Sequence, residues 1–155
     1  MEIKFEIANI EDAEVLVEVR NLSFFSDYIK YGECPGYNIS IESMTNTLLN
    51  TKIKSYKIFS DEKVVGNISV RENNDNTCYI GCLCVIPSYE NRGIGQHAIR
   101  FVEKEFSNVT VWSLETPADK ERNHYFYKKL GYNIVDEYMS GSVKVVLFEK
   151  KLLCK

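Results

Sequence analysis

Hydrophobic residues recur along this chain with two different periods, and these periods separate expected helices from expected strands. Apolar positions three or four residues apart are typical of helices, whereas short alternating or continuous apolar runs are typical of strands. Helical spacing is found at 11–29, 41–50, 95–106 and 117–130. Strand patterns are found at 5–10, 54–60, 63–72, 77–86, 109–115, 132–139 and 143–152.

Residues at the ends of these segments support the expected boundaries. Asn9 and Ser40 stand where a side chain can cap the first turn of a helix. Pro117 is expected at the start of the last helix, and Gly131 just after its end, because proline and glycine favour these positions.

The expected order of elements is β-α-α-β-β-β-α-β-α-β-β. Three meandering strands precede a strand–helix–strand unit, whose helix is expected to make a right-handed crossover between parallel strands. The order predicts an α/β (α+β) fold with a mixed, mostly antiparallel central sheet and helices on both faces. The chain of 155 residues is long enough for one well-packed core, so we expect a single domain over residues 1–155.

Composition narrows the range of partners. The net charge of -3 disfavours a bulk electrostatic interaction with nucleic acid. No apolar run reaches 18 residues, so no membrane partner is expected, and the charged N-terminal segment is unlike a signal peptide. We therefore expect a cytoplasmic protein.

The cysteines are expected to be free thiols. Their number is five, which is odd, and the expected compartment is reducing. Cys78, Cys82 and Cys84 alternate along one strand pattern, so they are expected to share one sheet face as small apolar residues. A metal site would need a fourth ligand and a turn, so no metal is expected.

The stretch "IPSYENRGIGQHAIRF" at 86–101 contains a glycine turn that opens a helix. Gly93 and Gly95 let the backbone approach a ligand, and the first helical turn offers free N–H groups to a phosphate. The letters "GIGQHA" also match a dinucleotide fingerprint, with Glu115 twenty residues after Gly95. In that fold, however, the glycines follow the first strand directly. A glycine turn without a ligand remains the third interpretation.

Two motifs together favour another interpretation. A strand ending in V-x-P, followed by R-G-x-G at a helix start, resembles motif A of the GNAT-type N-acetyltransferases. The later stretch "YFYKKLGYNIVDEY" at 125–138 resembles motif B of that family, at the expected separation. The chain departs from the family pattern at four positions. These are Glu90 for glutamine or arginine, Asn91 for glycine, Lys120 for asparagine and Asn123 for alanine.

The resemblance implies acetyl-CoA as the co-substrate. Its pyrophosphate would lie on the backbone N–H groups of residues 92–97, and its pantetheine arm would pair with strand 77–86 like an added strand. A split between that strand and strand 109–115 would make room for the arm. The residues implied to contact acetyl-CoA are Leu83, Val85, Asn91, Arg92, Gly93, Ile94, Gly95, Gln96, His97 and Asn123.

The resemblance also implies transfer of an acetyl group to a primary amine by direct attack. Tyr127 matches the family tyrosine near the thioester sulfur, and a phenol is a suitable acid for a departing thiolate. The general base stays open between Glu115, His124 and water. The alternative from another class is a non-catalytic module that binds CoA or a metabolite as a sensor.

The acceptor has no motif. A small-molecule or peptide amine is implied, and the resemblance implies that the loop at 28–38 covers it. Tyr28, Tyr31 and Tyr37 form an aromatic wall in one interpretation and pack the loop onto the sheet in the other. The resemblance also allows a longer acyl chain and a homodimer through the last strands.

Overall fold

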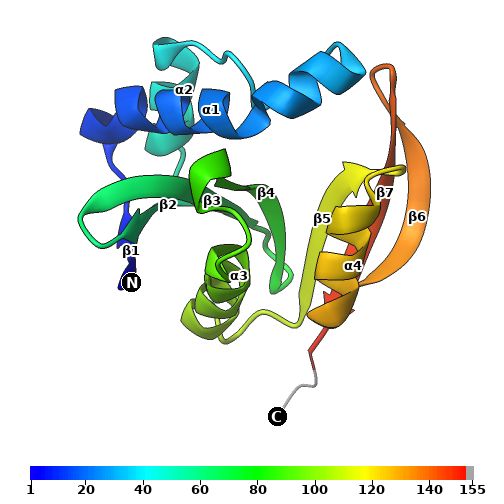
Figure 1. Ribbon diagram of the computed structural model, residues 1–155. Helices are drawn as coiled ribbons and strands as arrows, with labels where there is room; N and C mark the ends of the chain where they lie inside the picture. The colour runs from blue at the N-terminus through cyan, green and yellow to red at the C-terminus, as the bar shows by residue number, and fades with distance from the viewer. Residues whose placement is uncertain (153–155) are drawn as a thin grey trace.

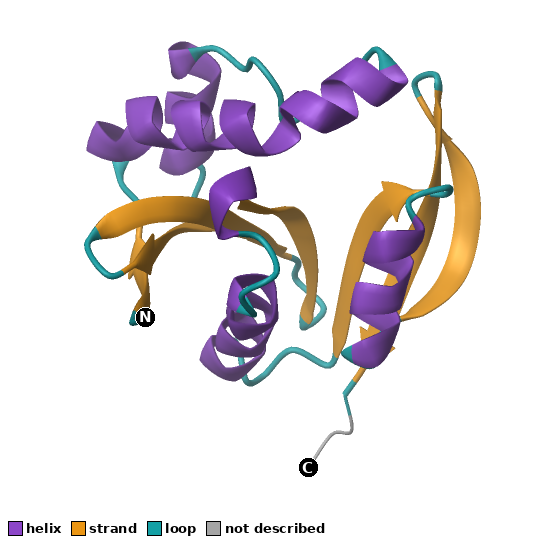
Figure 2. Cartoon of the chain, viewed as in Figure 1, coloured by secondary structure: helices purple, strands orange, loops and turns teal. Residues whose placement is uncertain are grey.

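The computed structural model describes residues 1–152, so Cys154 and its two neighbours lie outside the described part of the predicted domain. The chain forms one seven-stranded sheet with helices on both faces, which confirms the predicted fold class (Figures 1 and 2). The strands are β1 (Ile3–Ile7), β2 (Ile53–Ser60), β3 (Lys63–Glu72), β4 (Thr77–Val85), β5 (Val111–Pro117), β6 (Asn133–Ser140) and β7 (Val143–Lys151). The helices are α1 (Ala13–Tyr31), α2 (Ile41–Leu49), α3 (Ile94–Glu105) and α4 (Glu121–Lys129).

The sheet has the strand order β1-β2-β3-β4-β5-β7-β6. Every neighbouring pair is antiparallel except β4 and β5, which are parallel and are connected through α3. This agrees with the predicted meander followed by one strand–helix–strand unit.

The two predicted helix caps are confirmed, whereas several predicted boundaries are wrong. The first strand, predicted at 5–10, is Ile3–Ile7, and the strand predicted at 109–115 is Val111–Pro117. Asn9 caps a short 3₁₀ turn before α1, and the Ser40 hydroxyl accepts the Ser43 N–H at 3.0 Å at the start of α2. Pro117, however, is the last residue of β5, and α4 begins only at Glu121. The Ala118 N–H donates to the Lys144 carbonyl of β7, so the pairing with β7 continues past the proline and delays the helix.

The two sheet faces are covered by different helices. α1 and α2 cover one face, and α3 and α4 lie on the other (Figure 1). On the α3 side, Phe101 stacks on Phe5 of β1 and packs edge-on against Tyr56 of β2. On the α1 side, Arg20 donates to Asn67 of β3. Both faces of β3 are therefore covered, and its residues 65–70 are all buried.

A bulge at Gly81 changes the face on which the later residues of β4 lie. Ile80 pairs with Val70, but Cys82 pairs with Ser69, so Gly81 has no partner in the register. Residues directly opposite each other share a face, and the consecutive residues Ser69 and Val70 point to opposite faces. Cys82 therefore lies on the opposite face from Ile80.

The expectation that three cysteines share one face is consequently wrong. Cys78 lies on the α3 face, whereas Cys82 and Cys84 lie on the α1 face, and all three are buried. The period-2 pattern could not show this, because one extra residue in a strand reverses the side of all residues beyond it. The four cysteines in the described residues are free thiols.

Candidate active site

The parallel strands β4 and β5 separate along their length. They pair only through Thr77–Tyr79 and Val111–Ser113. β4 then continues to Val85 and β5 to Pro117 on diverging paths (Figure 1). The predicted split between these strands is confirmed. The backbone of β4 beyond Tyr79 therefore has no strand partner on the β5 side.

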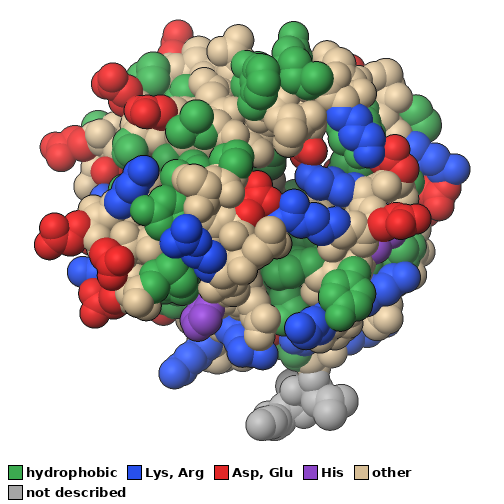
Figure 3. Space-filling view, in the orientation of Figure 1, with side chains coloured by type: hydrophobic (Ala, Val, Ile, Leu, Met, Phe, Trp, Pro, Cys, Tyr) green, Lys and Arg blue, Asp and Glu red, His purple; other side chains and the backbone are tan. Residues whose placement is uncertain are grey.

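A cleft of about 870 Å³ occupies this gap. In the space-filling view a hollow opens near the middle of the face, with Lys and Arg side chains beside it (Figure 3). We call its two parts the α3 half and the α1 half. The α3 half is lined by residues from 83–96 and 122–130, and the α1 half by residues from 20–36, 79–82, 114–120 and 140–145.

The glycine turn forms the end wall of the α3 half. Asn91 and Gly93 both have left-handed backbone angles, with φ of 62° and 79°, and Gly93 directly precedes α3. The first helical hydrogen bond runs from the His97 N–H to the Gly93 carbonyl. The N–H groups of the first helical turn before His97 therefore remain available to a ligand, at the positive end of the helix dipole.

Gly95 has a packing role besides leaving the backbone open. A Cβ at this position would lie 3.2 Å from Cζ of Phe126, which belongs to α4. The missing side chain therefore lets α4 approach the start of α3 closely. The two glycines of this turn thus reflect two different constraints, the backbone angle at Gly93 and close packing at Gly95.

Two residues expected at the cofactor lie away from the cleft lining. The guanidinium of Arg92 donates to the Ser88 carbonyl at 3.1 Å and lies 4.7 Å from the centroid of the Tyr89 ring. The Nδ1 atom of His97 lies 2.7 Å from the Gly93 carbonyl oxygen. The other eight expected residues line the cleft: Leu83, Val85, Asn91, Gly93, Ile94, Gly95, Gln96 and Asn123.

An ion pair joins the glycine turn to α4. The Arg122 guanidinium donates to the Glu90 carboxylate, and both residues line the cleft. Glu90 stands where the resembling family has glutamine or arginine, and its charge is offset by Arg122 here. Sequence reasoning did not single out Arg122, because the two residues are 32 positions apart.

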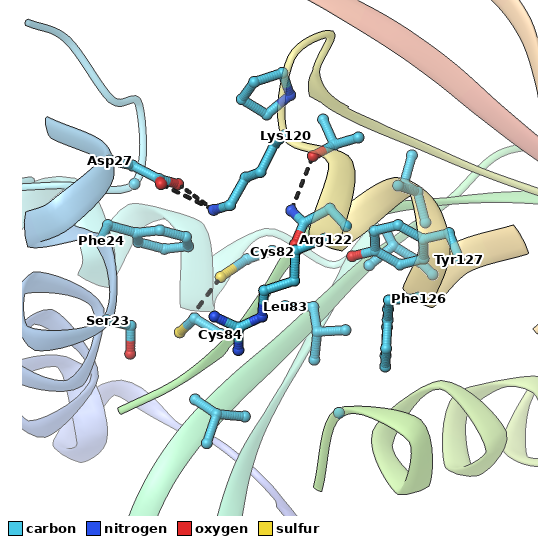
Figure 4. A pocket seen from close by; sticks show the side chains of 18 of the residues that line it. Ser23, Phe24, Asp27, Cys82, Leu83, Cys84, Lys120, Arg122, Phe126 and Tyr127 are labelled. Carbon is cyan, nitrogen blue, oxygen red and sulfur yellow. Dashed lines mark hydrogen bonds and ion pairs between the residues drawn. The ribbon is translucent and has the colours of Figure 1, made fainter. Parts of the chain in front are cut away.

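Tyr127 of α4 faces the gap between the strands. Its side chain is buried and packs against Phe148 and Tyr132. Its hydroxyl has no hydrogen-bond partner among the described residues, yet it is not sealed from solvent, and it points into the cleft (Figure 4). Burial, and then the neighbouring Cys82, raise the pKa of Tyr127 above its usual value. The phenol therefore holds its proton at neutral pH.

The neighbours of Tyr127 on α4 have structural contacts. Asn123 donates to the Thr116 hydroxyl at 2.9 Å, which attaches the start of α4 to β5. The His124 ring lies 3.1 Å from the Pro117 carbonyl oxygen through Nε2 and packs edge-on against Phe148. His124 is not part of the cleft lining.

Glu115 lies in the α1 half between two tyrosines. The Tyr138 hydroxyl donates to the Glu115 carboxylate, and Tyr79 lies beside it. Burial, and then Glu115, raise the pKa of Tyr138 to about 12 and that of Tyr79 still further. Glu115 is on the face of β5 opposite to Leu114 and Thr116, which are buried. Its carboxylate therefore borders the α1 half.

The end of α1 reaches across the cleft to the segment before α4. Asp27 and Lys120 point toward each other, with both carboxylate oxygens 2.8 Å from Nζ (Figure 4). The Tyr31 hydroxyl donates to Asp119 at 2.7 Å. Sequence reasoning noted Lys120 only as a departure from the family pattern. No local signal indicates its partner, which lies 93 positions earlier.

The three loop tyrosines do not form a common wall. Tyr28 and Tyr37 stack on each other at 4.6 Å between ring centroids, and neither lines the cleft. Tyr31 does line it. Tyr37 thus packs on Tyr28 and Phe25 of α1, whereas the sequence interpretations had the tyrosines form an aromatic wall or pack the loop onto the sheet.

Two kinds of feature are absent from the described residues. None of the helices is long and apolar enough to cross a membrane. Within residues 1–152, no group of three or more His, Cys, Asp or Glu side chains is arranged to hold a metal ion.

Solved structures share this fold over nearly the whole chain. The PaiA N-acetyltransferase of Thermoplasma acidophilum, solved in complex with coenzyme A, is 24% identical with a TM-score of 0.83, covering 98% of this chain and 100% of its own. The ribosomal-protein-S18-alanine N-acetyltransferase of Escherichia coli is 11% identical with a TM-score of 0.81, covering 99% and 96%. At these identities the likeness shows the fold.

Sequence comparison shows the family. The uncharacterized protein YrkN of Bacillus subtilis (strain 168) is 35% identical over 85 residues, which are 54% of this chain and 46% of that protein. The match thus spans about half the length of this relative. The model of the acetyltransferase (GNAT) family matches residues 17–132, which include motif A, the first part of motif B and all residues of the cleft lining except Ser140, Val143 and Val145. The chain belongs to the GNAT acetyltransferase family.

Proposed function

We propose that this protein transfers an acetyl group from acetyl-CoA to a primary amine of a small molecule or peptide, by direct attack within a ternary complex. The activity is assigned to the one domain predicted over residues 1–155. The observation that carries the proposal is the opening between β4 and β5, into which an unpaired strand backbone, a free helix start and the Tyr127 hydroxyl all project.

The α3 half fits the chemistry of coenzyme A. The free N–H groups at the start of α3 suit a pyrophosphate, because they combine hydrogen-bond donors with the positive end of the helix dipole. The unpaired backbone of β4 around Leu83 and Val85 suits the amide groups of a pantetheine arm, which would add to the strand edge. Arg122 also lines the cleft, and its guanidinium would reach the phosphates in competition with its ion pair to Glu90.

Tyr127 is proposed as the general acid. Its protonated hydroxyl reaches the cleft without a competing partner, so it can donate a proton to the departing thiolate of coenzyme A. The backbone N–H groups near Val85 are proposed to stabilise the oxyanion that forms when the amine attacks the thioester carbonyl.

Glu115 is proposed as the proton acceptor for the attacking amine, directly or through water. It borders the α1 half, from which an amine can approach. His124 is less suitable, because its ring is engaged with Pro117 and Phe148 outside the cleft lining.

Calorimetry with acetyl-CoA tests the proposal first. Dephospho-CoA and free adenine nucleotides serve as comparisons, since they separate recognition of the pantetheine arm from recognition of the nucleotide. We expect micromolar binding that requires the arm. If the protein binds no CoA at micromolar concentrations, or prefers NAD, the proposed function is wrong.

A sensor without turnover is the second candidate, because Glu90 places a carboxylate beside the expected phosphate site. Release of free CoA thiol in the presence of an amine panel separates the two candidates. An enzyme releases thiol in an amine-dependent manner, whereas a sensor binds CoA and releases none.

Initial rates test direct attack. Cys34, Cys82 and Cys84 line the cleft, and among these thiols Cys82 is the one whose pKa is lowered, by its contact with Cys84 first, so a covalent acetyl-enzyme would use Cys82. We expect intersecting double-reciprocal plots and retained turnover in Cys82→Ser. Parallel plots, together with loss of turnover in that variant, would instead indicate a covalent intermediate.

A further inference from the structure

Arg20 is a buried cation that lines the α1 half of the cleft. It lies in the middle of α1, its residue is only 9% exposed, and its side chain points toward β3. Its Nε donates to the Asn67 side chain at 2.9 Å, and its Nη2 lies 3.4 Å from the Ser69 hydroxyl. Both partners are neutral. The guanidinium is therefore held in place by side chains that do not offset its charge.

No carboxylate among residues 1–152 forms an ion pair with Arg20. The nearby acidic groups of the cleft have other partners. Asp27 is paired with Lys120, Glu115 accepts from Tyr138, and Glu33 accepts from the Ser142 N–H. A buried charge without a counter-ion is costly, so this position favours an anion supplied from outside the chain.

The guanidinium also has unused donors. Nη1 has no hydrogen-bond partner among the described residues, and it is not sealed from solvent. Because Arg20 lines the cleft, this group reaches solvent there. Arg20 can therefore donate to a molecule in the α1 half without giving up its bonds to Asn67 and Ser69.

We propose that Arg20 binds a carboxylate of the acceptor, so that the acceptor is an amine that also carries a carboxylate, such as an amino acid or a peptide with a free C-terminus. This inference rests on the proposed acetyl transfer and specifies its substrate class. The amine of such an acceptor would face Glu115 and the gap, while its carboxylate would lie against Arg20 under α1.

The charge balance favours a carboxylate over a phosphate monoester. One guanidinium offsets one negative charge, whereas a phosphate monoester carries about two at neutral pH. Arginine also presents a planar pair of donors that matches the two oxygens of a carboxylate. Lys120 does not add to the positive charge, because Asp27 offsets it.

Cys82 is the other group that could offset the positive charge of Arg20. The hydrogen-bonding contact with Cys84, and after it the charge of Arg20, lower the pKa of Cys82, and the two sulfur atoms are 4.0 Å apart. A Cys82 thiolate would then be the internal counter-ion, and an anionic acceptor would gain nothing. This alternative predicts the opposite result in the following experiment.

Matched acceptors in which a neutral amide replaces the carboxylate test the proposal, with each concentration expressed as unprotonated amine. The pairs are glycine and glycinamide, β-alanine and its amide, γ-aminobutyrate and its amide, and glycylglycine and its amide. Their kcat/KM values are compared at saturating acetyl-CoA by thiol release. Charge-assisted hydrogen bonds contribute about 10- to 100-fold, so we expect the carboxylate member of at least one pair to be preferred by about that factor. The glycylglycine pair distinguishes peptides from free amino acids.

Arg20→Met and Arg20→Lys assign the effect to this residue, and Arg100→Met is the matched control on the exposed surface of α3. Arg20→Met is expected to remove the preference for the carboxylate acceptor, mainly by raising its KM. Arg20→Lys should retain part of this preference, and Arg100→Met should leave it unchanged. Circular dichroism and acetyl-CoA calorimetry check that each variant folds. If Arg20→Met does not fold, the unmodified protein and Arg20→Lys still decide the question.

Each result has a definite meaning. Acetylation without preference for a carboxylate in any pair overturns this inference and leaves the proposed function intact. A preference that persists in Arg20→Met also overturns it. If the unmodified protein shows no carboxylate preference and Cys82 is alkylated more slowly in Arg20→Met, the inference is overturned. Arg20 then stabilises a Cys82 thiolate instead of binding the acceptor. Failure to bind CoA, or to release thiol with any amine, overturns the proposed function and this inference together.

Discussion

The two halves of the cleft are built in different ways. The α3 half offers a ligand backbone groups from the end of β4 and the turn that opens α3, and side chains of α4 complete it. The α1 half is formed by side chains from α1, β5 and the segment before α4, including a contact between residues 93 positions apart. A backbone site can serve any member of a family that shares a co-substrate, whereas a side-chain site can differ from one member to the next.

The largest expected effect lies at the boundary of the two halves. Tyr127→Phe removes the proposed acid while keeping the ring that packs against Phe148. We expect kcat to fall by about 100-fold or more, because general acid catalysis typically contributes that much. The affinity for acetyl-CoA should change little, as measured by calorimetry.

Tyr28→Phe is the control for this variant, since it removes a hydroxyl outside the cleft lining. Its kcat should match that of the unmodified protein. Full turnover in Tyr127→Phe would show that another group protonates the departing thiolate, or that no general acid is needed.

The next effect concerns the α1 half alone. Asp27→Asn or Lys120→Met leaves one charge of a largely buried pair without its partner. Losing an exposed ion pair costs about 1 kcal/mol, and breaking a buried one costs about 3 kcal/mol. We expect the free energy of unfolding, measured in urea, to fall by an amount between these two values. The KM of the acceptor should rise while acetyl-CoA affinity stays constant.

The double variant sharpens this prediction. Both single changes break the same ion pair. The double variant Asp27→Asn with Lys120→Met should therefore lose less unfolding free energy than the sum of the two single losses. Additive costs, or a matching loss of acetyl-CoA affinity, would contradict the separation of the two halves.

A smaller effect is expected in the α3 half. Glu90→Gln removes the carboxylate that engages Arg122 and frees this cation for the phosphates. Acetyl-CoA affinity should rise about two- to fivefold, in keeping with the strength of exposed ion pairs. Arg122→Gln should lower the affinity by a similar factor, and an unchanged affinity in both would show that the pair is unrelated to the co-substrate.

The smallest expected effect is a change in the free energy of unfolding at alkaline pH, caused by Tyr138 in the α1 half. The pKa of Tyr138 is raised to about 12, by burial first and then by Glu115, from a usual value near 10. A raised pKa contributes stability that is present below pH 10 and is lost as the pH rises toward 12, because the unfolded chain releases the proton first. Tyr138→Phe should therefore reduce the loss of unfolding free energy over this range. An identical alkaline profile would contradict the contact with Glu115.

Sequence reasoning succeeded where the signal is local. The strand pattern at 77–86, the glycine turn and the motif around Tyr127 together predicted the fold class and the split between β4 and β5, both of which the structure confirms. The start of α4 was wrong by four residues, because Pro117 continues the pairing with β7 that no local pattern reveals. The roles of the individual site residues remain predictions.

The sequence by itself determined the order of elements, the family and the backbone wall of the α3 half, because periodicity, glycine and short motifs act within a few residues of each other. Only the tertiary structure decided the charge pairs of the α1 half, the isolated cation at Arg20 and the face on which Cys82 lies. These depend on which distant segments meet and on a single bulge at Gly81. Contacts across long sequence separations leave no periodic signal in a single chain.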